Sequence, residues 1–133
     1  MKPSELNIQI LNSHLAAAYL RDRLMSIDHE ELWGIFLRKD KTVIVCEMLT
    51  KGTLTSTPID ARTIIKRALL VNAVAVVLLH NHPSGSSLPS QSDILATSRI
   101  KSACSIFDVY LLDHIILSEN SFYSFSEERV MNY

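Results

Sequence analysis

The stretch Val74-Ala75-Val76-Val77-Leu78-Leu79-His80-Asn81-His82-Pro83 decides how this chain folds. The apolar run 74–79 shows no alternation of polar and apolar residues, which predicts a central strand covered on both faces. Side chains two apart on a strand point the same way, so His80 and His82 should converge at its end while Asn81 faces away. Open α/β sheets bind ligands at such strand ends.

Strand and helix patterns alternate around this central strand. Helical spacing and capping residues, among them Ser13 and Asp60 as N-caps, predict helices over residues 14–28, 61–71 and 91–103. Apolar runs predict strands over residues 32–37, 42–49, 109–117 and 122–125, the first two joined as a hairpin. We expect an N-terminal arm or edge strand over 1–10 and one domain over 11–133. The predicted fold class is α/β (α+β), a mixed β-sheet flanked by helices.

Length and composition favour a globular protein and give no support to several function classes. The 133 residues are enough for one domain with a sizeable core, and 47% hydrophobic with 20% charged residues is a globular composition. With 13 basic and 14 acidic residues, the chain has no net positive charge for binding a phosphate backbone. We therefore expect no nucleic-acid partner for this chain alone. No apolar run approaches the ~18 residues of a membrane span, so we expect a cytoplasmic protein without a membrane partner.

The two cysteines give no sign of a disulfide or a metal cluster. Cys46 and Cys104 are far apart in the sequence, and neither belongs to a Cys-x-x-Cys pair. We interpret both as reduced packing residues, in keeping with a cytoplasmic location.

His80, His82 and Asp93 have the side chains of a metal site, because Zn²⁺ binds imidazole nitrogens and carboxylate oxygens. The Pro/Ser/Gly loop 83–89 turns the chain back, and Asp93 begins the helix that follows. Three protein ligands leave the fourth position of zinc to water, as in catalytic sites. The alternative is a polar strand end followed by a helix cap, since Ser90-x-x-Asp93 resembles a capping box with Asp in place of Glu or Gln.

The histidine pair and the aspartate belong to a longer motif. His80-x-His82-Pro83 followed by Pro89-Ser90-x-x-Asp93 resembles the signature of the JAB1/MPN/Mov34 metalloprotease family, the JAMM motif. Its form His-Asn-His-Pro-Ser-Gly is similar to that of the bacterial RadC-like members, and the resemblance extends over roughly residues 10–133. It implies a JAB1/MPN-like fold with a cytidine-deaminase-like layout, and a Zn²⁺ cofactor held by the two histidines and the aspartate.

The resemblance also implies two catalytic residues. The family uses a glutamate at the head of a strand, in a pattern like Glu-x-x-Gly-hydrophobic, and Glu31-Leu32-Trp33-Gly34-Ile35 fits it. Glu31 would then be the general base that takes a proton from the zinc-activated water. Glu30 is one residue out of register, and Glu47 is a second candidate base. The family's oxyanion serine maps onto Ser90; its alternative role is a helix N-cap, and both roles require a hydroxyl that is free to turn.

The remaining histidines and the tryptophan are secondary candidates. His14 and His29 lie on or beside the first predicted helix and are interpreted as surface or packing residues. His114, on a predicted strand, could line the cleft but receives no ligand role. Trp33 is interpreted as a core residue.

Three functions of different class follow from these residues. The first is a zinc-dependent metallopeptidase or isopeptidase acting on a peptide or protein substrate that the sequence does not identify. The second is a non-catalytic metal-binding interaction module, and the third is a DNA-repair-associated factor of the RadC-like kind. A nucleoside deaminase is excluded, because the Pro-Cys-x-x-Cys part of its zinc signature is absent. The expected edge strand at residues 6–10 offers a surface for a homo-oligomer or an extended substrate.

Overall fold

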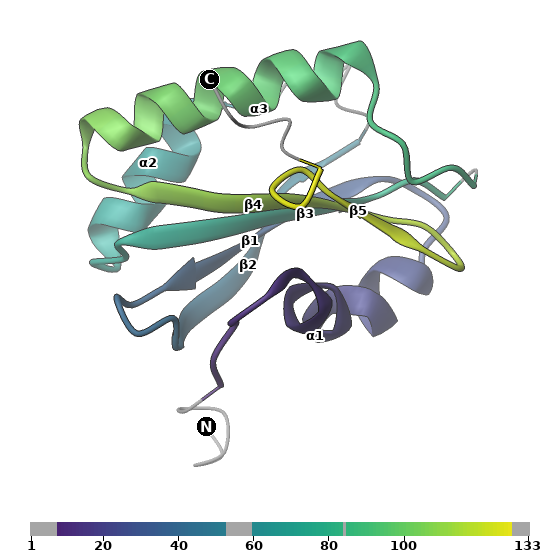
Figure 1. Cartoon of the computed structure of the whole chain (residues 1–133), viewed down its shortest axis with the longest axis horizontal. Helices are drawn as coiled ribbons and strands as arrows, with labels where there is room; N and C mark the ends of the chain where they lie inside the picture. Colours follow the sequence, from purple (N-terminus) through teal and green to yellow (C-terminus); the bar gives the residue numbers. More distant parts are fainter. Residues whose placement is uncertain (1–7, 53–59, 84, 129–133) are drawn as a thin grey trace.

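The computed structural model describes residues 8–52, 60–83 and 85–128, which form a five-stranded sheet between two layers of helix (Figure 1). The order of the strands across the sheet is β2-β1-β3-β4-β5. In chain order the elements are α1 (Ser13–Met25), β1 (Glu31–Leu37), β2 (Val43–Lys51), α2 (Ala61–Leu70), β3 (Ala75–Asn81), α3 (Gln91–Ile106), β4 (Tyr110–Leu117) and β5 (Phe122–Ser124).

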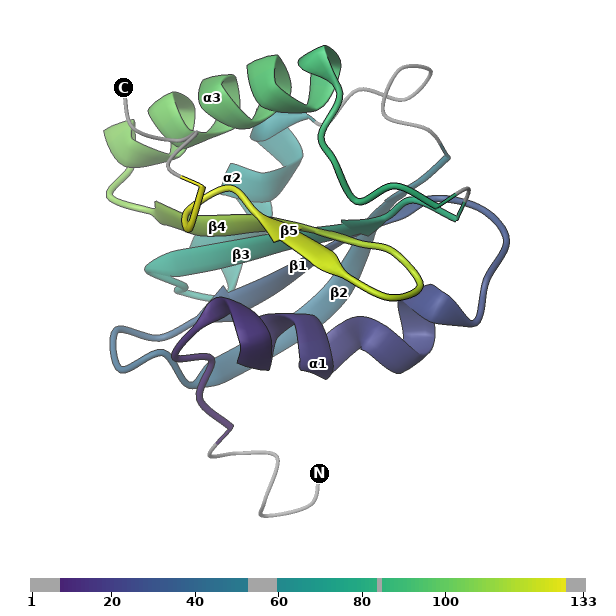
Figure 2. The same ribbon diagram turned by 45° about the vertical axis from the view of Figure 1, so that its right-hand side comes forward.

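The sheet is mixed, as the sequence predicts. β1 and β2 form the predicted antiparallel hairpin, and β1 also pairs antiparallel with β3. β3 and β4 are parallel, which requires a crossover connection, and α3 supplies it. α1 covers one face of the sheet, while α2 and α3 cover the other (Figures 1 and 2). The predicted α+β fold with a mixed sheet flanked by helices is confirmed.

Two hydrophobic cores lie on opposite faces of the sheet. β3 is buried along its whole length, because its alternate side chains enter the two cores in turn. This explains why its sequence shows no polar alternation. The core beneath α2 and α3 includes Leu32, Phe36, Ile64, Val76, Leu78 and Ile100. The core beneath α1 includes Leu20, Leu24, Ile35, Leu37, Val77 and Leu79.

The boundaries of the elements differ from the predicted ones at a few places. Asn12, rather than Ser13, is the N-cap of α1, and its side chain accepts a hydrogen bond of 2.9 Å from the backbone N–H of Leu15. Asp60 caps α2 as predicted. β3 extends through residues 80–81, beyond its apolar run, because these two residues still pair with neighbouring strands. The first of the motif histidines therefore stands on the strand itself.

The structure bears on three further predictions. Of the expected N-terminal arm, residues 1–7 lie outside the described residues, and Gln9 forms an isolated antiparallel bridge with Thr42. Residues 53–59 also lie outside them. Cys46 and Cys104 are both free thiols, and Cys104 is buried. In the part of the chain that the structure describes, no helix has the length and apolar character needed to cross a membrane.

Candidate metal centre

His80 and His82 meet at the end of β3. The Nε2 atoms of the two rings are 3.0 Å apart. His80 is buried in the strand, and His82 continues the ladder through a 2.9 Å hydrogen bond from its backbone N–H to the carbonyl of Leu117. Both side chains lie on the face of the sheet covered by α3, because residues two apart on a strand share a face. The spacing of the pair predicts this convergence.

Asp93 reaches the histidines from the first turn of α3. Its two carboxylate oxygens lie 3.8 Å from His80 Nε2 and 3.7 Å from His82 Nε2. One of these oxygens also accepts a 2.8 Å hydrogen bond from the backbone N–H of Ser90, and the Ser90 hydroxyl accepts one of 3.0 Å from the backbone N–H of Asp93. The capping box is therefore present, and the same carboxylate faces the histidines.

A chain of hydrogen bonds sets the tautomer of His80. The Thr97 hydroxyl donates to the carbonyl of Asp93 at 2.7 Å, so it accepts from Nδ1–H of His114 at 2.6 Å. Nε2 of His114 then carries no proton and accepts from Nδ1–H of His80 at 2.7 Å. His80 is left with an unprotonated Nε2 that is directed at His82.

His82 presents the same kind of nitrogen. Its Nδ1–H donates to the carbonyl of Ser86 at 2.8 Å, which leaves Nε2 with a lone pair. Two lone pairs therefore face one another across 3.0 Å, an arrangement that a shared cation stabilises. In a tetrahedral zinc site with bonds of about 2.0–2.1 Å, neighbouring donor atoms stand about 3.3 Å apart. The 3.0 Å between the two Nε2 atoms is close to this spacing, and Asp93 places a different carboxylate oxygen near each ring, Oδ1 at 3.8 Å from His80 and Oδ2 at 3.7 Å from His82.

Burial keeps the inner imidazoles neutral, which is the form that binds metal. It lowers the pKa of His80; the charge of Asp93 opposes this shift and that of His82 adds to it. Burial also lowers the pKa of His114 well below the usual value, and His80 and His82 lower it further. Neither ring therefore needs to lose a proton before the site can accept an ion.

Glu30 is the glutamate that approaches the histidines. Its Oε1 lies 3.8 Å from His82 Nε2, and ligand atoms of Glu30, His80 and His82 all lie within 4.8 Å of one another. Burial raises the pKa of Glu30; His82 opposes this shift, and Asp93 contributes to it. A carboxylate with a raised pKa beside a metal site is suited to accept and return a proton.

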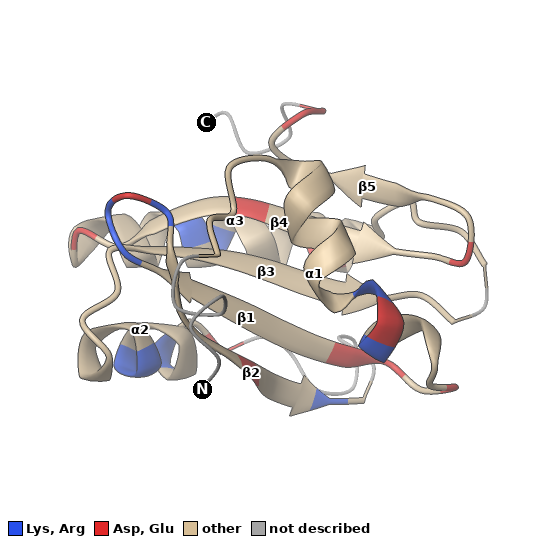
Figure 3. Cartoon of the chain, turned by 90° about the horizontal axis from the view of Figure 1, so that it is seen from below, with Lys and Arg blue, Asp and Glu red and all other residues tan. Residues whose placement is uncertain are grey.

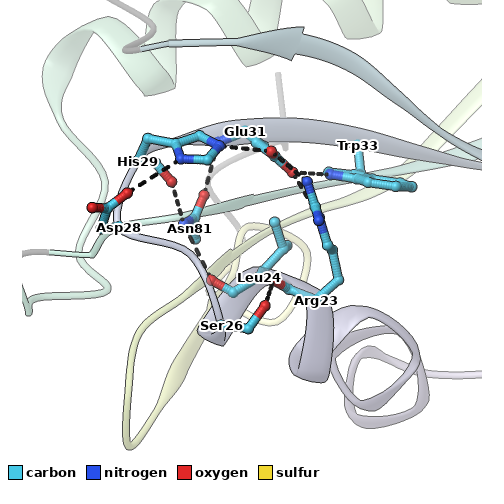
Figure 4. Close-up of polar contacts among 8 residues, drawn as sticks. All are labelled: Arg23, Leu24, Ser26, Asp28, His29, Glu31, Trp33 and Asn81. Carbon is cyan, nitrogen blue, oxygen red and sulfur yellow. Dashed lines mark hydrogen bonds and ion pairs between the residues drawn. The ribbon is translucent and has the colours of Figure 1, made fainter.

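The structure places Glu31 elsewhere, against the prediction that it is the general base. Its buried carboxylate accepts hydrogen bonds from Arg23 at 2.8 Å, from His29 at 2.7 Å and from the indole N–H of Trp33 at 2.9 Å (Figure 4). Seen from below, charged segments gather where the end of α1 passes the start of β1 (Figure 3). Glu31 is thus part of an ion-pair network on the α1 face of the sheet.

The register of β1 on β3 explains this correction. Leu32 pairs with His80, so the side chains of residues 30 and 32 share the face of the histidines, while that of Glu31 faces α1. A change of one position moves a side chain to the other face of a sheet. Glu30, which the sequence pattern puts one residue out of register, is therefore the one on the correct face.

The other secondary candidates also lie away from the metal centre. Glu47 is paired in β2 with Arg67 of α2 through two hydrogen bonds, the longer of them 3.0 Å. The ring of His14 stacks edge-on against Phe122, with the ring centroids 5.1 Å apart. Trp33 packs against the core beneath α1, as predicted for a core residue.

A cleft adjoins the candidate metal centre. It has a volume of about 500 Å³ and includes His82 in its wall; its other lining residues are Leu24, Met25, Ile27, Asp28, Pro83 and Glu119. A second cavity of about 370 Å³, next to Asp113, contains none of the candidate ligands. His82 is the one candidate ligand in the wall of this cleft, and the other lining residues come from the end of α1, the residues after it, Pro83 and Glu119.

Sequence reasoning missed Thr97 and gave His114 no defined role. Thr97 follows Asp93 by four residues, so the two share one face of a helix, and this spacing is the signal that points to it. His114 carries no such local signal, because its contact with His80 depends on the register of two parallel strands.

Comparisons with known proteins agree with this geometry. The model of the RadC-like JAB domain matches residues 10–130. A UPF0758 protein of Leptothrix cholodnii is 42% identical over 85% of this chain and 51% of its own length, and one of Flavobacterium johnsoniae is 38% identical over 92% and 53%. The UPF0758 protein YfjY of Escherichia coli is 34% identical over 96% of this chain and 79% of its own. The chain spans about half the length of the first two relatives, and it belongs to the RadC-like JAB domain family.

Proposed function

We propose that this protein is a zinc-dependent hydrolase of the metallopeptidase or isopeptidase type, with His80, His82 and Asp93 as the metal ligands. The observation that carries the proposal is the pair of unprotonated Nε2 atoms, 3.0 Å apart, that face the carboxylate of Asp93. Membership of the RadC-like JAB domain family supports a hydrolase, and the two nitrogens with one carboxylate match a catalytic zinc site.

The roles of the chain's own groups follow from their positions. A bound Zn²⁺ would supply Lewis-acid chemistry, activating a water molecule and polarising the carbonyl of an amide. Glu30 takes a proton from that water and delivers it to the leaving amine. Ser90 is exposed at the start of α3, and its hydroxyl hydrogen can be donated to the carbonyl oxygen as negative charge develops there. Loss of one such donor typically costs about 10²- to 10³-fold in turnover.

The cleft beside His82 supports a peptide as the substrate. Met25 and Ile27 line it with apolar surface, and its volume of about 500 Å³ suits a side chain with a length of backbone. Asp28 and Glu119 add polar groups to its wall. We propose that the residue next to the scissile bond lies in this cleft.

A pair of variants tests the assignment of the base. Glu30→Gln should keep zinc and lose at least about 10²-fold in hydrolysis of a quenched fluorescent peptide library, which is a typical loss when a general base is removed. Glu31→Gln is the matched control, one residue away on the opposite face, and should retain hydrolysis if it folds. Zinc content is measured on both proteins. Full activity in Glu30→Gln would contradict the role of Glu30, and a zinc-loaded wild type without hydrolysis would favour a metal-binding interaction module.

A further inference from the structure

We propose that Asn81, the residue between the two motif histidines, is a positioning residue that holds Glu30 at the metal centre. The proposal rests on the proposed function for the catalytic role of Glu30. It adds a role for the one side chain of the His-Asn-His motif that faces away from the metal ligands.

In the described part of the chain, the Asn81 side chain makes its hydrogen bonds with backbone groups of one segment. Its Oδ1 accepts from the backbone N–H of Glu31 at 2.9 Å, and its Nδ2 donates to the carbonyls of His29 at 2.9 Å and Leu24 at 3.2 Å (Figure 4). Asn81 has no exposed surface. The amide therefore holds the chain from the end of α1 to the first residue of β1.

Glu30 lies between two of these contacts. The carbonyl of His29 and the N–H of Glu31 flank it on either side, and the Asn81 amide bonds both as a neighbouring strand would. Among the described residues the Glu30 side chain makes no hydrogen bond; its Oε1 lies 3.8 Å from His82 Nε2, and a carboxylate oxygen lies within 4.8 Å of a ring nitrogen of His80. The backbone carbonyl of Glu30 accepts a 2.9 Å hydrogen bond from the N–H of Gly52, so Gly52 and Asn81 together hold the backbone that positions this carboxylate.

The position of Asn81 in β3 joins this segment to the ligands. Because strand side chains alternate, His80 and His82 face α3 and the candidate metal site while Asn81 faces α1. Of these three consecutive residues, His80 and His82 therefore face the candidate metal site. Asn81 holds the segment that carries Glu30 on the other face. Without the amide, two carbonyls and one N–H lose a buried partner, and the segment moves to recover hydrogen bonds.

The test compares Asn81→Ala with Ser124→Ala in the full chain. Ser124 is a matched control because it is buried and bonds Asp113 and the N–H of Glu127, with no contact to the candidate ligands. Amide hydrogen exchange at Glu31 needs neither metal nor activity. We also measure zinc content, and kcat and KM on a quenched fluorescent peptide that the wild type cleaves. The double variant Asn81→Ala with Glu30→Gln completes the set.

In Asn81→Ala, but not in Ser124→Ala, we expect loss of exchange protection at the Glu31 amide and a kcat lower by about 10²-fold, the cost of a misplacement near 1 Å. KM and zinc content should stay unchanged, and Asn81→Ala should add nothing in the Glu30→Gln background. The proposal is overturned if Asn81→Ala keeps its exchange protection at Glu31 or loses zinc. It is also overturned if kcat falls equally in Ser124→Ala, or if the effects of Asn81→Ala and Glu30→Gln are additive in the double variant. If the wild type cleaves no peptide, the proposed function fails, while exchange at Glu31 still decides whether Asn81 holds the segment around Glu30.

Discussion

His80 presents an unprotonated Nε2 to the candidate metal centre, because His114 accepts a hydrogen bond from the Nδ1–H of His80. The chain from Thr97 through His114 to His80 has contacts of 2.6 and 2.7 Å and runs through buried groups. Partners of this kind orient a ligating imidazole and raise its basicity. His114 is therefore placed to orient His80, although it is not itself one of the candidate ligands.

Replacement of His114 tests this relation. His114→Phe keeps an aromatic ring but removes the acceptor for Nδ1–H of His80, so zinc affinity should fall about 10- to 100-fold. Competition with a chromophoric chelator measures the affinity. His14→Phe, an exposed histidine in ring contact with Phe122, is the control and should bind zinc like the wild type. Equal affinity in His114→Phe would show that the tautomer of His80 does not depend on this contact.

Glu31 stabilises the fold in a way that depends on pH. Burial opposes ionisation, but hydrogen bonds from Arg23, Trp33 and His29 outweigh it and lower the pKa of Glu31 from 4.5 to about 2. A lowered pKa in the folded state means that this stabilisation is complete above pH 4.5 and is lost as the pH falls toward 2. A shift of this size corresponds to roughly 3 kcal/mol.

Chemical denaturation over this range measures the effect. The free energy of unfolding of the wild type should exceed that of Glu31→Gln at about pH 6, and the difference should shrink by roughly 2–3 kcal/mol by about pH 3. Gln keeps an acceptor for the indole of Trp33 but cannot carry the charge that Arg23 binds. A difference that is constant with pH would contradict the assigned role of the Glu31 carboxylate.

At the level of elements, β1 shows what the sequence can and cannot predict. The strand, its hairpin with β2 and the burial of Trp33 are predictable from apolar composition and turn residues. The face of the sheet to which each β1 side chain points is not predictable, because both faces of β1 are buried and no polar alternation separates them. The choice between Glu30 and Glu31 depends on pairing with β3, a contact between distant parts of the chain.

Gly34, the glycine of the Glu-x-x-Gly pattern, has a packing role of its own in β1. A Cβ atom added at Gly34 would lie 3.0 Å from the Phe36 ring and 3.1 Å from Leu49. A larger side chain would press on these two side chains, so packing in β1 favours glycine here, whichever glutamate precedes it.

Gly34→Ala tests this explanation. We expect a loss of about 1–3 kcal/mol of stability from overpacking, measured by urea denaturation. In a zinc-loaded protein that still folds, the metal content should be unchanged. Stability equal to the wild type would show that Phe36 and Leu49 move aside without cost.

At the scale of the molecule, separate parts of the chain contribute residues to the candidate metal centre. β3 supplies His80, the residue directly after that strand is His82, α3 supplies Asp93, and the segment before β1 supplies Glu30. The grouping of the histidines with Asp93 is predictable, because strand periodicity and a helix start are local signals. Glu30, His114 and Asn81 acquire their positions only from strand register, which the sequence of one chain does not reveal.

The most direct test of a metal centre in this protein is its zinc content by elemental mass spectrometry, after loading with Zn²⁺ and removal of free ion. The wild type should hold close to one zinc per chain, and the variant with both His80→Ala and His82→Ala should hold none, while both remain folded by circular dichroism. A folded wild type that stays free of zinc, or a double variant that binds as much zinc as the wild type, would contradict the assignment of the two histidines as ligands.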